Sequence, residues 1–133
     1  FIIGALETLR APDELLLRIE IPVTACDIRY ERVVFGHRTI AGAAAALPKD
    51  PANKPRIWVG CIATHPTSLP TTERYISANP DSLDDGLTHA IKTDIGTLDI
   101  VSDEDASADY RRHLAETVTR RAITAAADKK GIP

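Results

Sequence analysis

The sequence contains no methionine, and only two of its 133 residues are cysteines, Cys26 and Cys61. Two cysteines without a CxxC motif or a histidine at ligand spacing exclude a disulfide-rich secreted scaffold and a zinc finger. We therefore predict that the two thiols are not bridged to each other. Because the chain begins at Phe1 and not at a methionine, we expect it to be a fragment of a larger protein of the reducing cytoplasm.

Long hydrophobic runs and an excess of basic charge are also missing. No run approaches the roughly 18 apolar residues of a membrane span. The formal net charge is −3, which gives no bulk basic footprint for nucleic acid. With 44% hydrophobic residues and few aromatics, the chain suits one globular domain over residues 1–133, with a core of Ile, Leu, Val and Ala.

Strand-like patterns occupy the first half of the chain. Apolar and charged residues alternate strictly from Leu17 to Ile21, which predicts a half-buried strand over residues 15–21. Residues rich in β-formers predict two more strands, over residues 28–35 and 56–63. Ile19, Ile21 and Trp58 are the expected members of the apolar face of the sheet.

The alanine-rich run over residues 39–47 is ambiguous by itself. Five alanines favour a helix by propensity. Gly42 lies inside the run and Pro48 follows it, and small residues also suit a strand that a helix covers closely. Residues 49–55 contain further prolines and predict a loop.

Helical patterns fill the second half of the chain. Residues 71–79 form a short predicted helix that ends at Asn79-Pro80. Asp81 or Ser82 is the expected cap of a second helix, and residues 92–102 are expected to be irregular. The second helix carries apolar residues at helical spacing: Leu83, Leu87, Ala90 and Ile91.

The third predicted helix is the best defined by sequence. Ser107 is its expected N-cap, and Lys129-Lys130 followed by Gly131 mark its end. Its apolar stripe is predicted to lie against the sheet: Tyr110, Leu114, Val118, Ala122 and Ala125. On the outside we expect Arg112, together with Glu116 and Arg120 as an exposed i,i+4 pair.

Strands that precede helices in this order predict an α+β fold. The expected architecture is an antiparallel sheet of about three or four strands with the three helices packed on one of its faces.

No residue cluster marks a reaction centre, and we predict no catalytic, metal-binding or cofactor-binding residue in this chain. The four histidines lie far apart, and HExxH, GxSxG, GxGxxG and Walker A motifs are absent. His65 follows a predicted buried strand, where a plain surface loop is the simpler reading. Two basic pairs, residues 111–112 and 120–121, suit a phosphate, a partner's carboxylates, or local ion pairs with Asp109 and Glu116.

Three segments, read in order, resemble one family. Residues 1–22 resemble the boundary motif FFxGxxxTxLxPxElLxxIxIP, residues 57–66 resemble ialGGVAxxP, and residues 105–126 resemble SaeYRrxlaxvLxrRAl. These motifs belong to the C-terminal domain of the FAD-binding (medium) subunit of molybdenum hydroxylases, the group of carbon monoxide dehydrogenase and xanthine dehydrogenase. The third segment is the most specific match.

The resemblance implies a β-sheet with three helices on one side, and it implies that the alanine-rich run is a strand. It also implies a domain that covers the flavin region and helps the subunit to assemble with iron–sulfur and molybdenum partners. In the family, glycine-rich loops of two upstream domains hold most of the FAD. Those loops are absent from this sequence, so we expect FAD in the parent subunit and none in this chain alone. The alternative is a diverged binding or assembly module without flavin.

Three polar positions depart from the pattern of the family. Glu7 stands in place of a basic residue, Glu31 in place of a lysine, and Ser68 in place of an arginine. The two acidic substitutions reverse the local field where the resemblance places the flavin and its phosphates. Retention of flavin therefore depends on polar contacts, which the apolar residues that match the family do not determine.

Overall fold

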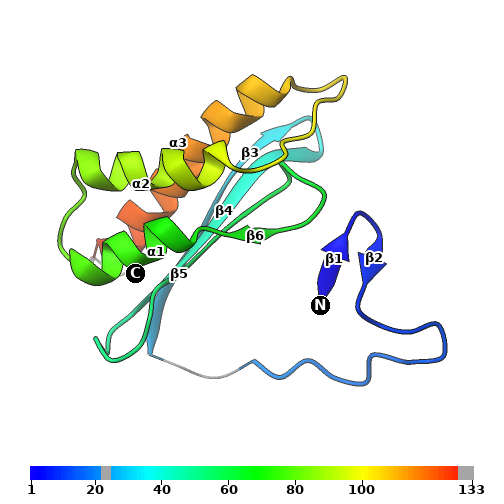
Figure 1. Cartoon of the computed structure of the whole chain (residues 1–133), viewed down its shortest axis with the longest axis horizontal. Helices are drawn as coiled ribbons and strands as arrows, with labels where there is room; N and C mark the ends of the chain where they lie inside the picture. Colours follow the sequence, from blue (N-terminus) through cyan, green and yellow to red (C-terminus); the bar gives the residue numbers. More distant parts are fainter. Residues whose placement is uncertain (22–24, 129–133) are drawn as a thin grey trace.

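The computed structural model describes residues 1–21 and 25–128, which form an extended N-terminal arm (residues 1–21) and a layered body (Figure 1). The body contains an antiparallel sheet in the order β3-β4-β5-β6, and its helices lie on one face of that sheet. The strands are β3 (Cys26–Phe35), β4 (Arg38–Pro48), β5 (Arg56–Gly60) and β6 (Thr67–Ser68). The predicted α+β class is confirmed.

The long hairpin of β3 and β4 forms the middle of the body. Gly36 adopts a left-handed conformation (φ +59°) in its turn, which a residue without a Cβ does at low cost. The alanine-rich run is a strand, as the family resemblance implies. Ala41, Ala43 and Ala45 are fully buried, because their small side chains let a helix approach β4 closely.

The three helices are α1 (Pro70–Ala78), α2 (Asp85–Gly96) and α3 (Ala108–Ala127). Helices α3 and α1 contact the strands, and α2 packs on these two helices. Asp84 caps α2, because its carboxylate accepts from the backbone N–H groups of Gly86 (2.9 Å) and Leu87 (3.2 Å). The predicted cap at Asp81 or Ser82 is therefore wrong. The expected irregular stretch is also wrong over residues 92–96, which continue α2.

Asp94 lies in the part of α2 that extends past the predicted end of the helix, and it contacts the start of α1. Its buried carboxylate accepts from the Thr72 amide (2.7 Å), the Thr72 hydroxyl (2.9 Å) and the Thr71 amide (3.1 Å). These groups belong to the first turn of α1, whose own N-cap residue Leu69 makes no side-chain hydrogen bond. A residue of α2 thus caps α1 and ties the two helices together.

Helix α3 packs on β3, β4 and β5 with a face that is rotated from the prediction. Ser107 is its N-cap as predicted, accepting from the amide of Tyr110 (3.2 Å). Leu114, Val118 and Ala122 are buried, but Tyr110 is 51% exposed and Ala125 only half-buried. The buried face of α3 consists of Arg111, Leu114, Ala115, Val118, Thr119, Ala122, Ile123 and Ala126. The predicted end at residues 129–131 lies outside the described residues.

The outer face of α3 also differs from the prediction. Arg112, Glu116 and Arg120 are half-buried, not exposed. Arg120 donates to the Thr88 hydroxyl and to the Leu83 carbonyl (2.9 Å) of the neighbouring helix region. No Glu116–Arg120 ion pair occurs within residues 1–21 and 25–128. Arg120 thus binds the neighbouring helix region and not Glu116, the partner predicted from the i,i+4 spacing.

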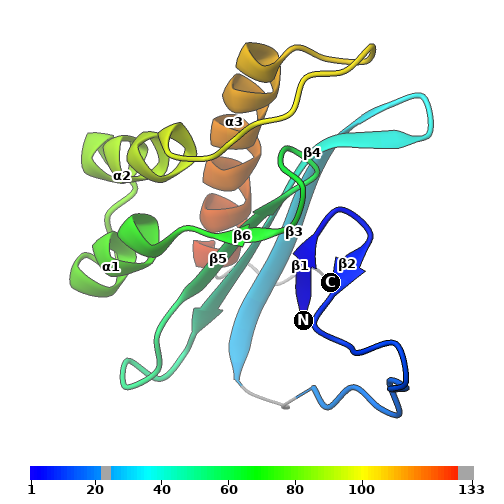
Figure 2. The same cartoon turned by 45° about the vertical axis from the view of Figure 1, so that its right-hand side comes forward.

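The arm lies on the side of the sheet opposite to the helices (Figures 1 and 2). It contains a small hairpin of β1 (Ile2–Gly4) and β2 (Glu7–Thr8), which contacts no helix or strand of the described body. The predicted strand over residues 15–21 is wrong, since this segment is extended, unpaired and exposed. Its alternating pattern suits a sheet, but no strand lies beside it within the described ranges 1–21 and 25–128.

Smaller differences concern the loops and the cysteines. The strand predicted over residues 56–63 ends at Gly60, and β6 follows directly after the predicted surface loop that contains His65. Cys26 and Cys61 form no disulfide, as predicted. Among the helices of the described residues, none has the length and apolarity that crossing a lipid bilayer requires.

Candidate functional site

Arg111 is the most deeply buried charged side chain among the described residues, at 3% exposure. Its guanidinium donates to the carbonyl oxygens of Ile40 and Cys61, each at 2.9 Å. It also pairs with the carboxylate of Asp103 at 2.6 Å. One side chain of α3 therefore ties the start of β4, the end of β5 and the loop before α3 to one another.

A second arginine extends this cluster to the surface. Arg38 pairs with Asp105 at 2.5 Å and with Asp103 at 3.7 Å. The hydrogen bond from Arg111 is the main cause that lowers the pKa of Asp103 below its ordinary value. The terminal amino groups of Arg111 donate to protein oxygens, whereas its buried Nε makes no hydrogen bond within the described residues. The cluster is thus a structural clamp, and the basic pair predicted at residues 111–112 does not act as a unit, because Arg112 pairs locally with Asp109 at 2.8 Å.

Cys61, held by this clamp through its carbonyl, has a left-handed backbone (φ +65°). It occupies the position of the second glycine in the ialGGVAxxP motif. A residue with a Cβ is strained in this region by about 1–3 kcal/mol.

Replacing Cys61 with glycine is therefore expected to raise the free energy of unfolding by about 1 kcal/mol, after the greater freedom of glycine in the unfolded chain is subtracted. Urea denaturation of the purified chain measures this change. The matched control is Cys61→Ala, which keeps the strain and should stay within about 0.5 kcal/mol of the parent. Equal stability of both variants would contradict the argument.

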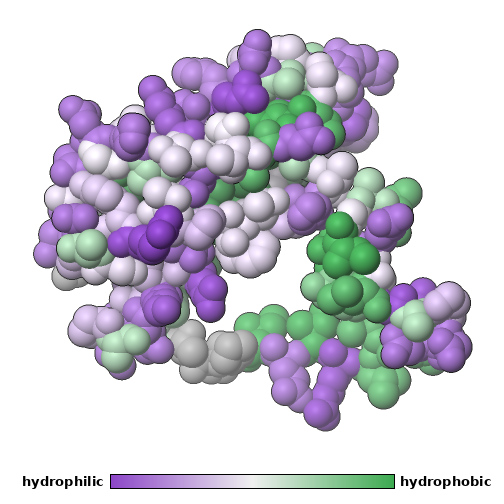
Figure 3. All heavy atoms as spheres, in the orientation of Figure 1, coloured by the Kyte–Doolittle hydropathy of each residue, from purple (hydrophilic) through white to green (hydrophobic). Residues whose placement is uncertain are grey.

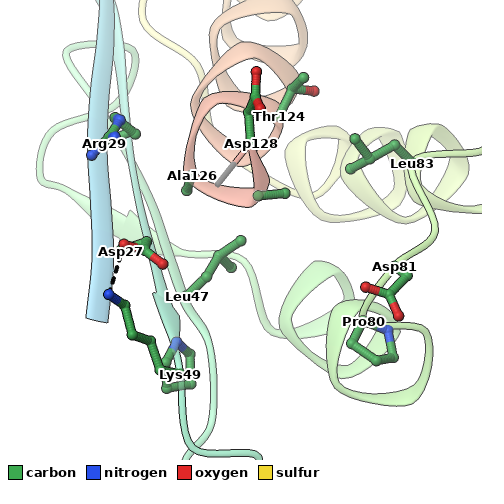
Figure 4. Close-up of a pocket in the computed structure, with 12 residues that line it drawn as sticks. Asp27, Arg29, Leu47, Lys49, Pro80, Asp81, Leu83, Thr124, Ala126 and Asp128 are labelled. Carbon is green, nitrogen blue, oxygen red and sulfur yellow. Dashed lines mark ion pairs between the residues drawn. The ribbon is translucent and has the colours of Figure 1, made fainter. Parts of the chain in front are cut away.

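A cavity of about 860 Å³ lies between the end of α3, the start of β3, the end of β4 and the α1–α2 loop (Figure 4). Charged groups of both signs line it, and the Asp27–Lys49 ion pair (3.6 Å) lies at one side. No histidine, cysteine or serine is among its lining residues.

The face of the sheet opposite to the helices is not covered by another element of the body (Figure 2). We call it the open face and define it by the residues of β3 to β6 that point away from the helices. Its members are Cys26, Ile28, Tyr30, Arg32, Val34, Thr39, Gly42, Ala44, Ala46, Pro48, Arg56, Trp58, Gly60 and Ser68. Trp58 is 43% exposed here, so the prediction that it belongs to the helix-covered face is wrong.

The arm carries a large apolar surface of its own. Ile19 and Ile21 are 75% and 82% exposed, which overturns their predicted place in the core. In the space-filling view an open space separates the arm from the body, and the apolar colour gathers along the arm (Figure 3). The other large apolar side chains of the arm that are exposed are Phe1, Ile2, Ile3, Leu6, Leu9, Leu15, Leu16 and Leu17. Contiguous exposed apolar surface of this kind marks an interaction site.

The structure does not bring together the other residues that the sequence analysis named. His65 is half-buried, with its Nδ1 3.2 Å from the Thr64 hydroxyl. Glu7 lies in the arm, Glu31 in β3 and Ser68 in β6, so the three departures belong to different elements. No group of three His, Cys, Asp or Glu residues suited to a metal ion occurs within the described ranges. Sequence reasoning missed the burial of Arg111, although this residue continues the helical spacing of Leu114, Ala115 and Val118.

The fold of this chain is similar to that of solved carbon monoxide dehydrogenase and quinoline oxidoreductase chains. The chain matches carbon monoxide dehydrogenase from Hydrogenophaga pseudoflava lacking the Mo-pyranopterin moiety (TM-score 0.80, 21% identity, 93% of this chain and 45% of that chain). It also matches reconstituted CO dehydrogenase from Oligotropha carboxidovorans (TM-score 0.71, 25% identity, 93% and 45%). A third match is quinoline 2-oxidoreductase from Pseudomonas putida 86 (TM-score 0.70, 22% identity, 80% and 39%).

The fold of this chain is thus similar to part of longer oxidoreductase chains. Residues 38–126 match the family model of the CO dehydrogenase flavoprotein C-terminal domain, and the chain belongs to this family. It spans less than half the length of the solved chains that it matches. Comparison with curated protein sequences finds no match.

Proposed function

We propose that this chain is the C-terminal domain of the FAD-binding subunit of a molybdenum hydroxylase. Electrons would pass from a molybdenum site through iron–sulfur clusters to FAD, and the cofactors would supply the chemistry. The match of residues 38–126 to the flavoprotein C-terminal family carries this proposal. The length of the related chains, of which this one spans 45%, supports a larger parent subunit.

The role proposed for the domain is to cover the flavin region and to support assembly, without a catalytic centre of its own. Its partners would be the upstream FAD-binding domains of the same subunit, and beyond them the iron–sulfur and molybdenum subunits, in the cytoplasm. The exposed apolar arm supports an assembly role, because a segment with this much apolar surface is stabilised by packing on another surface.

The described residues do not fit FAD. Helix N-termini are the usual anion sites, but here carboxylates occupy them: Asp94 at α1, Asp84 and Asp85 at α2, and Asp109 at α3. A pyrophosphate would meet like charge at each of them. The glycines are also dispersed over the chain and form no phosphate-binding loop.

We therefore expect no saturable binding when the purified 133-residue chain is titrated with FAD up to about millimolar concentration, monitored by flavin fluorescence. The parent subunit that contains the upstream domains is the matched control and should retain flavin. Saturable binding of FAD to the isolated chain in the micromolar range would contradict the proposal that upstream domains hold the cofactor.

A second candidate is an assembly module that has lost flavin, which the acidic Glu7 and Glu31 favour. Both candidates predict an upstream partner, but only the first predicts flavin in it. The coding sequence upstream of Phe1 distinguishes them, since glycine-rich FAD loops should be encoded there for a flavoprotein and be absent for the alternative.

A further inference from the structure

Strand β3 is the end strand of the four-stranded sheet, so one of its edges has no neighbouring strand among the described residues. Its odd-numbered residues bond to β4, since the Ala25 carbonyl accepts from the Lys49 amide (3.0 Å) and hydrogen-bonded pairs alternate along an antiparallel ladder. The even-numbered residues Ile28, Tyr30 and Arg32 therefore direct their backbone N–H and C=O groups to the free edge. A free edge of this kind is a template for an added strand.

Residues 15–21 of the arm have the pattern of an edge strand but belong to no sheet of the described residues. Arg18 and Glu20 lie on one side of the segment, where their side chains form an exposed ion pair of 2.8 Å. The opposite side carries only large, exposed apolar residues: Leu15, Leu17, Ile19 and Ile21. The segment therefore has one charged side, one apolar side and backbone groups that can join a ladder.

One antiparallel register places this segment beside β3 with both of its sides matched. On the open face, Ile19 would lie opposite Tyr30, and aromatic pairs with β-branched residues stabilise a sheet. Ile21 would lie opposite Ile28, and these opposite residues are also the ones that exchange backbone bonds at the free edge. A shift by one residue would turn the charged side of the segment onto the open face. The remaining opposite residues are Leu17 with Arg32 and Leu16 with Val33.

On the helix side of the sheet, the same register forms two pairs of opposite charge. Arg18 would lie opposite Glu31, which stands where the family has a lysine that would repel it. Glu20 would lie opposite Arg29, whose guanidinium now donates to the carbonyl of Ile28 (2.8 Å). Neither Glu31 nor Arg29 has an ion pair within residues 1–21 and 25–128. The charge match is thus a property of this sequence and not of the family pattern.

We infer that residues 15–21 of one copy add to the free edge of β3 in a second copy, so that two chains exchange their arms. A reciprocal exchange gives each arm and each free edge a partner and closes as a two-fold dimer. Within its own chain the arm leads away from the start of β3 (Figures 1 and 2). This self-association goes beyond the proposed function and depends on no cofactor.

Sedimentation velocity and amide hydrogen exchange test the inference on the purified 133-residue chain. At about 100 μM the chain should sediment as a dimer, which should dissociate into monomers on dilution. The amides of Ile19 and Tyr30 should exchange about ten-fold or more slowly in the dimer than in the dilute monomer, because each enters a backbone hydrogen bond of the new ladder.

Charge reversal tests the register. Arg18→Glu places like charges opposite each other twice in a two-fold dimer, and it should raise the dissociation constant about ten-fold or more. Adding Glu31→Arg restores opposite charges and should return the dissociation constant to within about three-fold of the parent value. The matched control is Arg121→Glu, the same change at an exposed position of α3, which should leave the dissociation constant unchanged. Circular dichroism verifies that all variants are folded.

Each other outcome overturns the inference. A chain that stays monomeric at about 100 μM, with fast exchange at Ile19 and Tyr30, overturns it outright. Monomers with slow exchange at these amides overturn it in favour of a hairpin within one chain. A dimer that Arg18→Glu does not weaken, or that Glu31→Arg does not restore, overturns it in favour of another interface. None of these measurements involves flavin, so the failure of the proposed function is a separate result, seen as a parent subunit without FAD.

Discussion

Replacing Arg111 with methionine is expected to lower the free energy of unfolding by about 3–4 kcal/mol. Methionine fills a similar volume but donates no hydrogen bond. The carbonyls of Ile40 and Cys61 would then lose their guanidinium donors, at about 1–3 kcal/mol for each polar group left unsatisfied in a buried place. Urea denaturation of the purified chain measures the loss.

The same variant should change the dependence of stability on pH. Arg111 lowers the pKa of Asp103 in the folded state, so the ion pair stabilises the fold above the unfolded pKa of about 3.9 and loses this effect as the pH falls through the folded pKa. In Arg111→Met the ion pair is absent, so its contribution to the decrease of the free energy of unfolding at low pH should disappear. Comparison of the two proteins between pH 7 and about pH 3 tests the sign.

Arg112→Met is the matched control, because Arg112 is the adjacent arginine and pairs only with exposed Asp109. Its loss should cost less than about 1 kcal/mol. If the two variants were equally stable, Arg111 would not act as the clamp between β4, β5 and the loop before α3.

Truncating Leu114 to alanine is the second change with a large expected effect, a loss of about 2–5 kcal/mol. Leu114 is buried on the face of α3 that packs on the sheet. Removing its side chain leaves a cavity between two rigid layers that cannot collapse fully. The loss is a large share of the stability of a small domain and should be measured by chemical denaturation.

Glu116→Ala is the control on the same helix and should cost well under 1 kcal/mol. Glu116 is half-buried and makes no ion pair within the described ranges. If Glu116→Ala were as damaging as Leu114→Ala, the face of α3 that carries Glu116 would be buried against another domain or a second copy of the chain.

Local signals predicted the helices well. Ser107 caps α3 as expected. Its hydroxyl oxygen accepts from the free amide of Tyr110, and this bond joins residues that are close in sequence. The end of α1 near Asn79-Pro80 is also where the structure has it, since proline disfavours a helical residue before it. The cap of α2 was misplaced by two or three residues, because Asp81, Ser82 and Asp84 carry equivalent cap chemistry.

The alanine-rich strand shows where residues alone are insufficient. Propensity favours a helix there, and only the family resemblance selected a strand. In the structure, β4 lies between β3 and β5 under α3, and burial on the helix side selects small residues. Close packing between a sheet and a helix thus outweighs a propensity difference of a few tenths of a kcal/mol per residue.

For the arm, the local pattern predicted a strand that the described residues do not form. Residues 15–21 alternate as a strand should, but the segment has no partner strand among the described residues and remains exposed. An alternating pattern indicates which face of a strand can be buried. It does not identify the segment or the chain that pairs with this strand. Trp58 was assigned to the wrong face for a related reason, since its neighbours Ile57 and Val59 are the buried residues of β5.

The sequence by itself determined the α+β class, the start of α3 at its Ser107 cap, and the family, because caps, periodicity and motifs act over a few residues. Only the tertiary structure decided which face of α3 is buried, that Arg111 joins three segments and Asp94 caps α1, and that one face of the sheet stays open. Each of these depends on groups that are far apart in the chain. Their contacts come from the packing of whole layers, which no local pattern encodes.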